Sequence, residues 1–241
     1  MKKYISTYLC IPSKILAILI LCHGICFSQN GMTVSSEAQK LKDAGLVDIR
    51  DLDSSIAVHL LYATDSNFVG KTMYKSLREA YLQAEAAKML VAAQKHLKQV
   101  CPGCKLIVYD AARPQWAQEI MWNSVKDTPM KRYVASPQRI SMHTYGVAVD
   151  VSILDENGRE IDMGTPVDFL GALAEPANET KYLASGELTL EQVKNRELLR
   201  SVMKKSGFRG ISNEWWHFEA LARTDAQRKY KTMINGIMTG R

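Results

Sequence analysis

The spacing of apolar residues predicts one long helix in the first half of the chain. Small and apolar side chains recur at helical intervals over residues 77–100, at Ala80, Ala84, Ala87 and Val91. Ser76 and Glu79 stand three residues apart before this run, which is the arrangement of a capping box at a helix start. Pro102 and Gly103 follow the last apolar position, so the helix is expected to end there.

The same spacing predicts further helices on either side of this one. Thr189 and Gln192 form a second capping pair, and Gly207 closes the segment that they open. Pro114 suits the first turn of a helix, because the N–H that it lacks would have no partner there. These helices are predicted over residues 35–44, 114–125, 189–206 and 226–237.

Alternating or continuously apolar runs predict short strands between the helices. Residues 105–109 (KLIVY) have the composition of a buried strand. Residues 147–153 (VAVDVSI) alternate, which places three valines on one face and Asp150 on the other. Asn157 and Gly158 signal a turn within a hairpin over residues 153–161. Extended segments are also expected at residues 54–63 and 215–219, and irregular chain at residues 64–74 and 162–186.

Strands and helices mix along the chain without a regular βαβ rhythm. This order predicts a single α+β domain, with a small and mostly antiparallel sheet flanked by helices. The chain has 241 residues, of which 46% are hydrophobic and 23% charged. That length supports one core, and that composition excludes a fibrous or intrinsically disordered protein.

The first 28 residues differ from the rest of the chain. A basic start, Met1-Lys2-Lys3, precedes an apolar run over residues 15–27, which is shorter than the ~20 residues that span a bilayer. Polar residues follow Ser28, so residues 1–28 are predicted to be a signal peptide and residues 29–241 the mature domain. The mature domain is then expected to be exported, to a periplasm, without stable membrane insertion. The alternative is a single anchoring helix that is not cleaved.

Removal of this leader changes what the composition implies about partners. It removes Lys2, Lys3 and Lys14 and no acid, which lowers the formal net charge from +6 to +3. No basic stripe interleaved with aromatic residues remains, so a nucleic acid is not an expected partner. The sequence carries no signal for an oligomeric state.

Cys101 and Cys104 are the two cysteines that remain after removal of the leader, and a local disulfide between them is favoured over a redox dithiol in an oxidising compartment.

Two polar segments combine histidines with acids. In residues 141–150 (SMHTYGVAVD), His143 precedes a glycine turn and Asp150 lies on the following strand. A carboxylate on a hydrophobic strand is costly to bury unless it is paired or binds a metal. In residues 213–219 (NEWWHFE), His217 and two acids are packed among three aromatic residues. Such surroundings raise the pKa of a carboxyl group toward neutrality, as a general base requires.

These residue types fit a catalytic zinc site. Two histidines, one carboxylate and a water molecule are a common zinc set, and a glutamate that is not a ligand accepts the proton of that water. On residue types alone, a lone histidine on a strand is usually a structural residue. An iron oxygenase also uses two histidines and a carboxylate, but its histidine and first acid are usually closer in sequence than residues 143 and 150. The His-Glu-x-x-His zinc motif is absent, and Ser201-Val-Met-Lys204 lacks the companion motifs of a serine mechanism.

The two segments resemble motifs of the zinc D-alanyl-D-alanine peptidases. Those motifs are Ser-x-His-x-x-Gly-x-Ala-x-Asp at residues 141–150 and Glu-x-Trp-His at residues 214–217. Three more segments are similar to the dipeptidase branch, the type found in vancomycin resistance: residues 62–70 (YATDSNFVG), 110–114 (DAARP) and 162–169 (DMGTPVDF). The five motifs follow one another in the same order as in the family, over about residues 46–222.

The resemblance implies a role for each matching residue of the reaction centre. His143, Asp150 and His217 would bind Zn²⁺. Glu214 would act as the general base and then as the acid. Arg113 would stabilise the oxyanion, a task that suits its permanent charge and fork of donors, although a surface salt bridge is the simpler alternative for this side chain.

The resemblance also implies residues that hold the substrate. Asp168 would bind the free ammonium group of a dipeptide, whereas the residues alone are equally compatible with a turn or cap position. Ser141 would contact an end group of the substrate or would only orient its loop. Tyr62, Asn67 and Phe68 would shape the pocket.

The implied reaction is zinc-dependent hydrolysis of D-alanyl-D-alanine to two D-alanines, during turnover of cell-wall peptides. One alternative is a zinc D,D-carboxypeptidase or endopeptidase that acts on longer peptidoglycan peptides. Another is a non-catalytic, zinc-stabilised wall-binding module, against which Glu214 and Arg113 argue because a structural site requires neither. The family often has an aromatic residue before the Arg-Pro pair, and Ala112 at this position predicts looser support for Arg113.

Overall fold

A five-stranded sheet forms the centre of the fold, in the order β2-β4-β5-β7-β6. A computed structural model describes residues 35–230, so the predicted signal peptide lies outside the described residues. The strands are β2 (Ala57–Val58), β4 (Lys105–Asp110), β5 (Ala148–Leu154), β6 (Arg209–Gly210) and β7 (His217–Glu219). Only β2 and β4 run parallel, so the prediction of a small, mostly antiparallel sheet is confirmed.

The register of this sheet places three polar residues side by side. Asp110 on β4 is paired with Asp150 on β5, and Asp150 is paired with His217 on β7. The register of β4 and β5 shifts between Val108 and Asp110, which marks an irregularity at the polar end. Two carboxylates that face each other across strands repel, so this position requires nearby positive charge.

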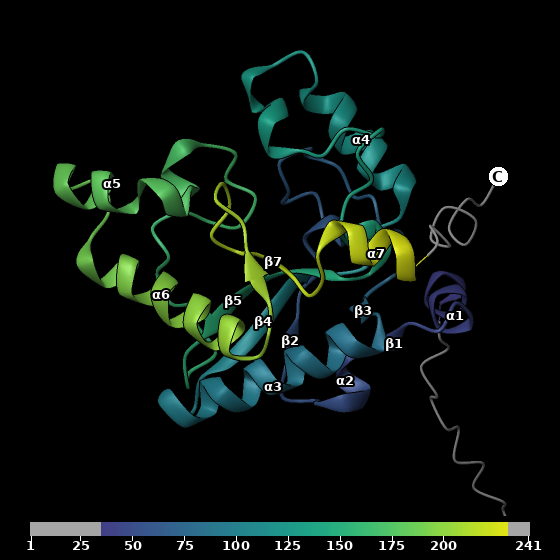
Figure 1. Ribbon diagram of the computed structural model, residues 1–241, viewed down its shortest axis with the longest axis horizontal. Coiled ribbons are helices and arrows are strands. Elements are labelled where there is room, and N and C mark those ends of the chain that lie inside the picture. Colours follow the sequence, from purple (N-terminus) through teal and green to yellow (C-terminus); the bar gives the residue numbers. More distant parts are fainter. Residues whose placement is uncertain (1–34, 231–241) are drawn as a thin grey trace, which may run out of the picture. The chain divides into compact units, whose positions relative to one another are not determined.

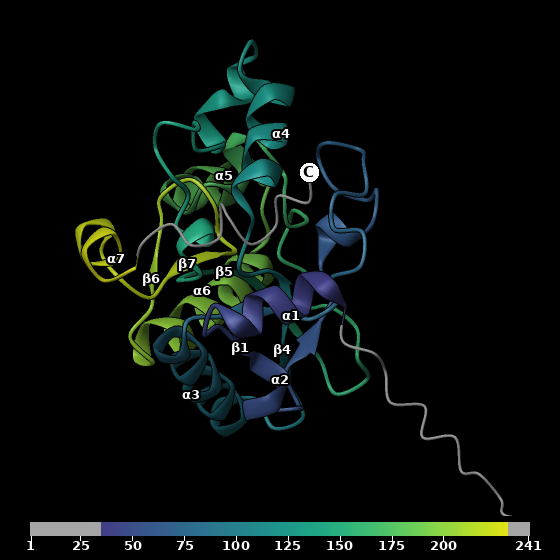
Figure 2. The same ribbon diagram turned by 90° about the vertical axis from the view of Figure 1, so that its right-hand side faces the viewer.

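Helices cover the sheet on both sides. All seven residues of β5 are buried, including Asp150 and Ser152. Figures 1 and 2 show the long helices α3 (Ala84–Val100) and α6 (Leu190–Lys205) together on one side of the sheet, and α4 (Gln115–Val125) on the other. The predicted strand is therefore present as β5, but both of its faces are buried and neither is exposed to solvent.

A smaller unit of structure precedes the main sheet. Helix α1 (Ser36–Asp43) begins at Ser35, whose hydroxyl accepts a hydrogen bond from the N–H of Ala38 at 3.1 Å. Strand β1 (Val47–Asp48) pairs antiparallel with β3 (Tyr81–Leu82), and the short helix α2 (Ile49–Leu52) follows β1.

The long helix begins later than its sequence predicts, at Ala84 instead of residue 77. The predicted capping box does not form, because Ser76 donates from its backbone N–H and its hydroxyl to Glu37 of α1, at 2.9 and 2.6 Å. Residues 81 and 82 are drawn into the pair with β1. Contacts with a distant segment thus override the local helical signal.

The second half of the chain follows the prediction more closely. Helix α6 begins with the predicted capping box of Thr189 and Gln192, in which both reciprocal hydrogen bonds are present. A short helix, α5 (Glu179–Ser185), lies in the stretch that was expected to be irregular. Helix α7 (Arg223–Lys229) starts before the predicted residue 226, and the predicted continuation beyond residue 230 lies outside the described residues.

Several short 3-10 turns complete the fold. They are η1 (Leu61–Ala63), η2 (Pro129–Tyr133), η3 (His143–Tyr145), η4 (Ala172–Ala174) and η5 (Pro176–Asn178). Cys101 and Cys104 are joined by a disulfide between the end of α3 and the start of β4. Within residues 35–230, no helix has the length and apolar character needed to cross a membrane.

Candidate metal centre and active site

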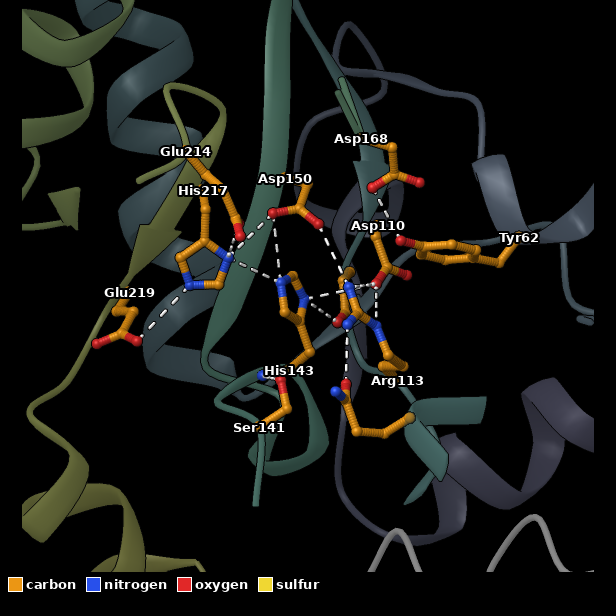
Figure 3. Close-up of polar contacts among 12 residues, drawn as sticks. Tyr62, Asp110, Arg113, Ser141, His143, Asp150, Asp168, Glu214, His217 and Glu219 are labelled. Atoms are coloured by element: carbon orange, nitrogen blue, oxygen red, sulfur yellow. Dashed lines mark hydrogen bonds and ion pairs between the residues drawn. The ribbon is translucent and has the colours of Figure 1, made fainter. Parts of the chain in front are cut away.

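Three side chains from three different elements converge at one end of the sheet (Figure 3). His143 Nε2 and His217 Nδ1 are 3.0 Å apart. Asp150 Oδ1 lies 3.1 Å from His217 Nδ1 and 3.3 Å from His143 Nε2. Ligand atoms of a tetrahedral zinc ion, each at ~2.0–2.1 Å from the metal, lie about 3.3 Å from one another. The three atoms therefore have the spacing and the chemistry of a metal-binding set.

The local fold explains why these three residues meet. Pairing of β5 with β7 places Asp150 beside His217. The turn η3 carries His143 and ends at Gly146, whose φ of 69° is in the left-handed region. A Cβ atom at Gly146 would also lie 3.1 Å from Leu46 Cδ2. Both constraints favour glycine, which explains its place between the histidine and the aspartate of the first segment.

In each histidine, the ring nitrogen that points away from the metal-binding set faces a hydrogen-bond acceptor. His143 Nδ1 is 2.8 Å from the carbonyl oxygen of Ala111, so Nδ1 carries the proton and Nε2 is free to bind a metal. His217 Nε2 lies 3.6 Å from Glu219 Oε1. A carboxylate in this position favours the tautomer that leaves Nδ1 of His217 free.

The charges of the cluster depend strongly on one another. Burial by itself would raise the pKa of Asp150, but His143 and His217 hold this pKa well below its usual range. Burial would lower the pKa of His217, but hydrogen bonds to Asp150 and Glu219 raise it to about 10. The carboxylates of Asp150 and Glu219 favour the proton on His217, and they would equally stabilise a metal cation that replaced this proton.

Glu214 lies beside the metal-binding set without joining it. Its Oε2 is 3.9 Å from His217 Nδ1. Trp215 and Trp216, the next two residues, are buried, and Trp216 lines the same cavity as Glu214. Burial raises the pKa of Glu214 to about 8, which suits a group that must accept and release a proton near neutral pH.

Arg113 is held rigidly behind the histidines. Its Nε donates to Asp110 Oδ2 at 2.7 Å and its Nη1 to Gln118 Oε1 at 2.9 Å, while Nη2 lies 3.4 Å from Asp150 Oδ2. The Tyr62 ring packs on the guanidinium, with 5.1 Å from Cζ to the ring centroid. Arg113 is buried, so it is not a surface salt bridge, and Ala112 does not leave it unsupported.

Asp168 lies across the cavity from His217 and carries an unusual backbone. Its φ is 67°, in the region where residues other than glycine are rare. The Tyr62 hydroxyl donates to its Oδ1 at 2.9 Å, and its Oδ2 is buried with no hydrogen-bond partner among residues 35–230. Burial, followed by the charge of Asp150, raises the pKa of Asp168 to about 7. Within residues 35–230, no cationic side chain forms an ion pair with this carboxyl group.

One cavity of about 790 Å³ contains the seven predicted site residues. Ser141 is buried in its wall, and its hydroxyl accepts from the backbone N–H of His143 at 3.3 Å. Tyr62 and Phe68 also line the cavity. Asn67 does not, because its side chain donates to carbonyl groups of its own loop at Thr64 and Lys71.

Sequence reasoning missed the residues that support this cavity. Asp110 anchors Arg113 and accepts from the Tyr74 hydroxyl at 2.9 Å, yet no role of its own was predicted for it. Gln118 and Glu219 were also missed. Asp110 had one readable signal, since it ends a buried strand three residues before an arginine.

Comparison with known proteins matches this chain over most of its length. A family model described as D-ala-D-ala dipeptidase matches residues 42–235. A D-alanyl-D-alanine dipeptidase of Escherichia coli (strain K12) is 34% identical over 178 residues, which cover 72% of this chain and 83% of the relative.

The chain belongs to the D-Ala-D-Ala dipeptidase family.

Two other members of this dipeptidase family are more distant. A relative from Enterococcus faecium is 31% identical and covers 65% of this chain and 82% of its own. A relative from Synechocystis sp. (strain ATCC 27184 / PCC 6803 / Kazusa) is 24% identical, and the match covers 68% of this chain and 76% of the relative. The family resemblance that the five motifs indicate is thereby confirmed, and the protein is a peptidase of a metallopeptidase family.

Proposed function

We propose that this protein hydrolyses D-alanyl-D-alanine to two D-alanines, with Zn²⁺ bound by His143, Asp150 and His217. The main support is the convergence of three buried ligand atoms beside Glu214, in a member of the D-Ala-D-Ala dipeptidase family. The curated relatives from Escherichia coli and Enterococcus faecium carry the name of this activity.

The residues around the ligands have complementary tasks in this reaction. His143, Asp150 and His217 would hold a zinc ion, which would supply a lowered pKa for a water molecule and polarisation of the scissile carbonyl. Glu214 takes a proton from the attacking water and returns it to the leaving amine, since burial brings its pKa to about 8. Burial would lower the pKa of Arg113, but the charge of Asp110 raises this pKa well above its usual range, so Arg113 keeps its positive charge and donates to the oxygen on which negative charge develops.

Asp168 accounts for the restriction to a free dipeptide. Its Oδ1 is engaged by Tyr62, which leaves the buried Oδ2 to accept from the ammonium group of the substrate. A bound cation also lowers the pKa of Asp168 and favours the carboxylate. A peptide with a blocked amino group would leave this carboxyl group buried without a partner, which is costly.

The test is D-alanine release from D-Ala-D-Ala by purified residues 29–241, with and without a chelator. N-acetyl-D-Ala-D-Ala serves as the control. Chelator-sensitive release from the free dipeptide alone supports the proposal. Cleavage of the blocked peptide would instead indicate a D,D-carboxypeptidase or endopeptidase, and no cleavage of either would favour a binding module.

We further propose that the protein is exported after cleavage behind Ser28 and acts in cell-wall peptide turnover. An enzyme outside the cytoplasm meets D-Ala-D-Ala released from the wall, but it does not reach the precursors made inside. The amino terminus of the protein recovered from the periplasmic fraction tests the export. Unchanged growth of a deletion strain on D-Ala-D-Ala, together with reduced vancomycin tolerance, would contradict the scavenging role.

A further inference from the structure

Two arginines line the active-site cavity on a wall that the reaction does not use. Arg139 lies on the loop before Ser141, and Arg223 opens helix α7. Arg223 donates from Nη1 to the carbonyl oxygen of Ile140, so helix α7 is tied to the loop of Arg139. Burial, followed by the positive charge of Arg139, lowers the pKa of Arg223. Both arginines line the same cavity, on two segments that the hydrogen bond from Arg223 to Ile140 joins.

This wall lies at the opposite end of the site from Asp168. Figure 3 shows Asp168 and Glu219 at opposite ends of the drawn residues, with the metal-binding set between them. Arg223 belongs to the Glu219 end, because it opens helix α7 four residues after Glu219, the last residue of β7. The cavity thus has a carboxyl group without a positive partner at one end and a pair of guanidinium groups at the other.

The positive charge at this wall is not fully neutralised. Arg132 at the rim pairs with Glu175 at 2.7 Å. Glu219 Oε1 lies 3.6 Å from His217 Nε2, so this carboxylate is directed at the histidine. The guanidinium of exposed Arg139 has no hydrogen bond or ion pair with any residue from 35 to 230, although it lines the cavity.

A zwitterionic dipeptide matches this distribution of charge. With its ammonium group at Asp168 and its scissile carbonyl at the metal-binding set, its carboxylate extends toward the opposite wall. Guanidinium groups suit a carboxylate because their N–H donors form a planar fork. We propose that Arg139 and Arg223 bind the C-terminal carboxylate of the substrate and make the enzyme select a free carboxyl end. This inference rests on the proposed function for the direction in which the peptide lies.

The test compares D-Ala-D-Ala with its C-terminal amide. The wild-type enzyme is expected to have a KM for the amide at least about tenfold above that for the acid, in the range of a lost charge-assisted hydrogen bond. Arg139→Gln should raise KM for the acid about tenfold, with kcat within twofold, and should leave KM for the amide unchanged. Arg139→Lys should recover part of the loss, because it restores the charge without the fork.

A matched control separates this effect from a general loss of positive charge. Arg228 also projects from α7, is exposed, and pairs with Asp225 at 2.7 Å. Arg228→Gln is expected to leave KM unchanged for both the acid and the amide. Arg223→Gln should act like Arg139→Gln, but it also removes the bond to Ile140, so Arg139 provides the cleaner measurement.

Two results would overturn the inference. The first is that the wild-type enzyme has equal KM values for the acid and the amide. The second is that Arg139→Gln raises KM for the acid and KM for the amide by the same factor. Failure of the wild-type enzyme to cleave D-Ala-D-Ala is a different result, which contradicts the proposed function. In that case the comparison is made with N-acetyl-D-Ala-D-Ala and its amide. Selection of the acid by Arg139 is still expected there, and its absence would refute the role of this residue.

Discussion

At the scale of single residues, the protonation state of Glu214 decides whether the site can work. Replacing it as Glu214→Gln keeps the shape of the side chain and removes the acceptor for the proton. We expect kcat to fall by about 10²–10⁴-fold, the usual contribution of general acid–base catalysis, while the metal content stays unchanged. Steady-state kinetics and metal analysis of the same preparation test this.

Glu191→Gln provides the matched control for this substitution, since Glu191 is an exposed residue in the first turn of α6. Activity of Glu214→Gln within a few fold of wild type would show that another group accepts the proton. Loss of metal in the variant would show that Glu214 acts as a ligand instead.

Asp168 is a second residue whose environment conflicts with its charge. Burial raises its pKa to about 7 in the folded protein, from about 3.9 in an unfolded chain. Its contribution to stability is therefore fully present below about pH 4 and is lost as the pH rises through 7. Asp168→Asn should raise the free energy of unfolding at pH 8, on the order of 1–2 kcal/mol, and raise KM for the free dipeptide.

Urea unfolding of the chelated wild-type and variant proteins at pH 5 and pH 8 measures this effect. The advantage of the variant should be larger at pH 8 than at pH 5. A variant that is less stable than wild type at pH 8 would show that the carboxylate already has a stabilising partner without substrate.

At the scale of elements, helix α6 holds together the two segments that carry Asp168 and Glu214. Its buried Arg196 donates to the carbonyl oxygens of Met163 at 2.6 Å and Leu173 at 3.1 Å, on either side of Asp168. Arg196 also packs on the Trp215 ring, and Trp215 Nε1 donates to Thr165 Oγ1 at 2.8 Å. A helix that carries none of the metal ligands thereby fixes the substrate side of the cavity.

Arg196→Met should lower the free energy of unfolding by about 2–4 kcal/mol, because it leaves buried carbonyl groups without donors. KM for the dipeptide should rise more than kcat falls. Thr165→Val removes the hydroxyl that accepts from Trp215 Nε1 at 2.8 Å and from Arg196 Nη2 at 3.5 Å, and it should give a smaller shift in the same direction. Lys194→Met, at an exposed position of the same helix, is the control. An unchanged KM in a folded Arg196→Met protein would contradict this positioning role.

At the scale of the whole molecule, the metal-binding set links segments that are far apart in the sequence. His143 and Asp150 come from the middle of the chain and His217 from near its end, and all three are buried. A ligand that binds only the folded state at 100 times its Kd stabilises it by about 2.7 kcal/mol. For a domain of this size, zinc should raise Tm on the order of 5–10 °C.

Thermal unfolding with and without a chelator tests this, with His217→Ala as the variant in which the shift should disappear. A zinc-dependent shift that persists in His217→Ala would place the metal elsewhere. An absent shift in the wild-type protein would contradict a resident metal at these three residues.

Local sequence was sufficient where the decisive interactions are local. The capping box of α6, the buried strands β4 and β5 and the turn at Gly158 depend on residues within a few positions of one another. The metal-binding set was predicted for a related reason. Asp150 lies on an otherwise apolar strand, where an unpaired charge would be too costly, and the resemblance of the two local motifs to the zinc D-alanyl-D-alanine peptidases implied the full ligand set.

Tertiary structure decided what depends on distant partners. Ser76 donates a hydrogen bond to Glu37 of α1 instead of capping a helix, and α3 begins at Ala84. Tyr62 joins Arg113 to Asp168, and helix α7 brings Arg223 to the wall of Arg139. No periodicity encodes these contacts, because their strength comes from burial and opposite charge between segments that become neighbours only after the chain has folded. The sequence by itself therefore determined the kind of chemistry, and the folded structure determined the shape and polarity of the site in which it occurs.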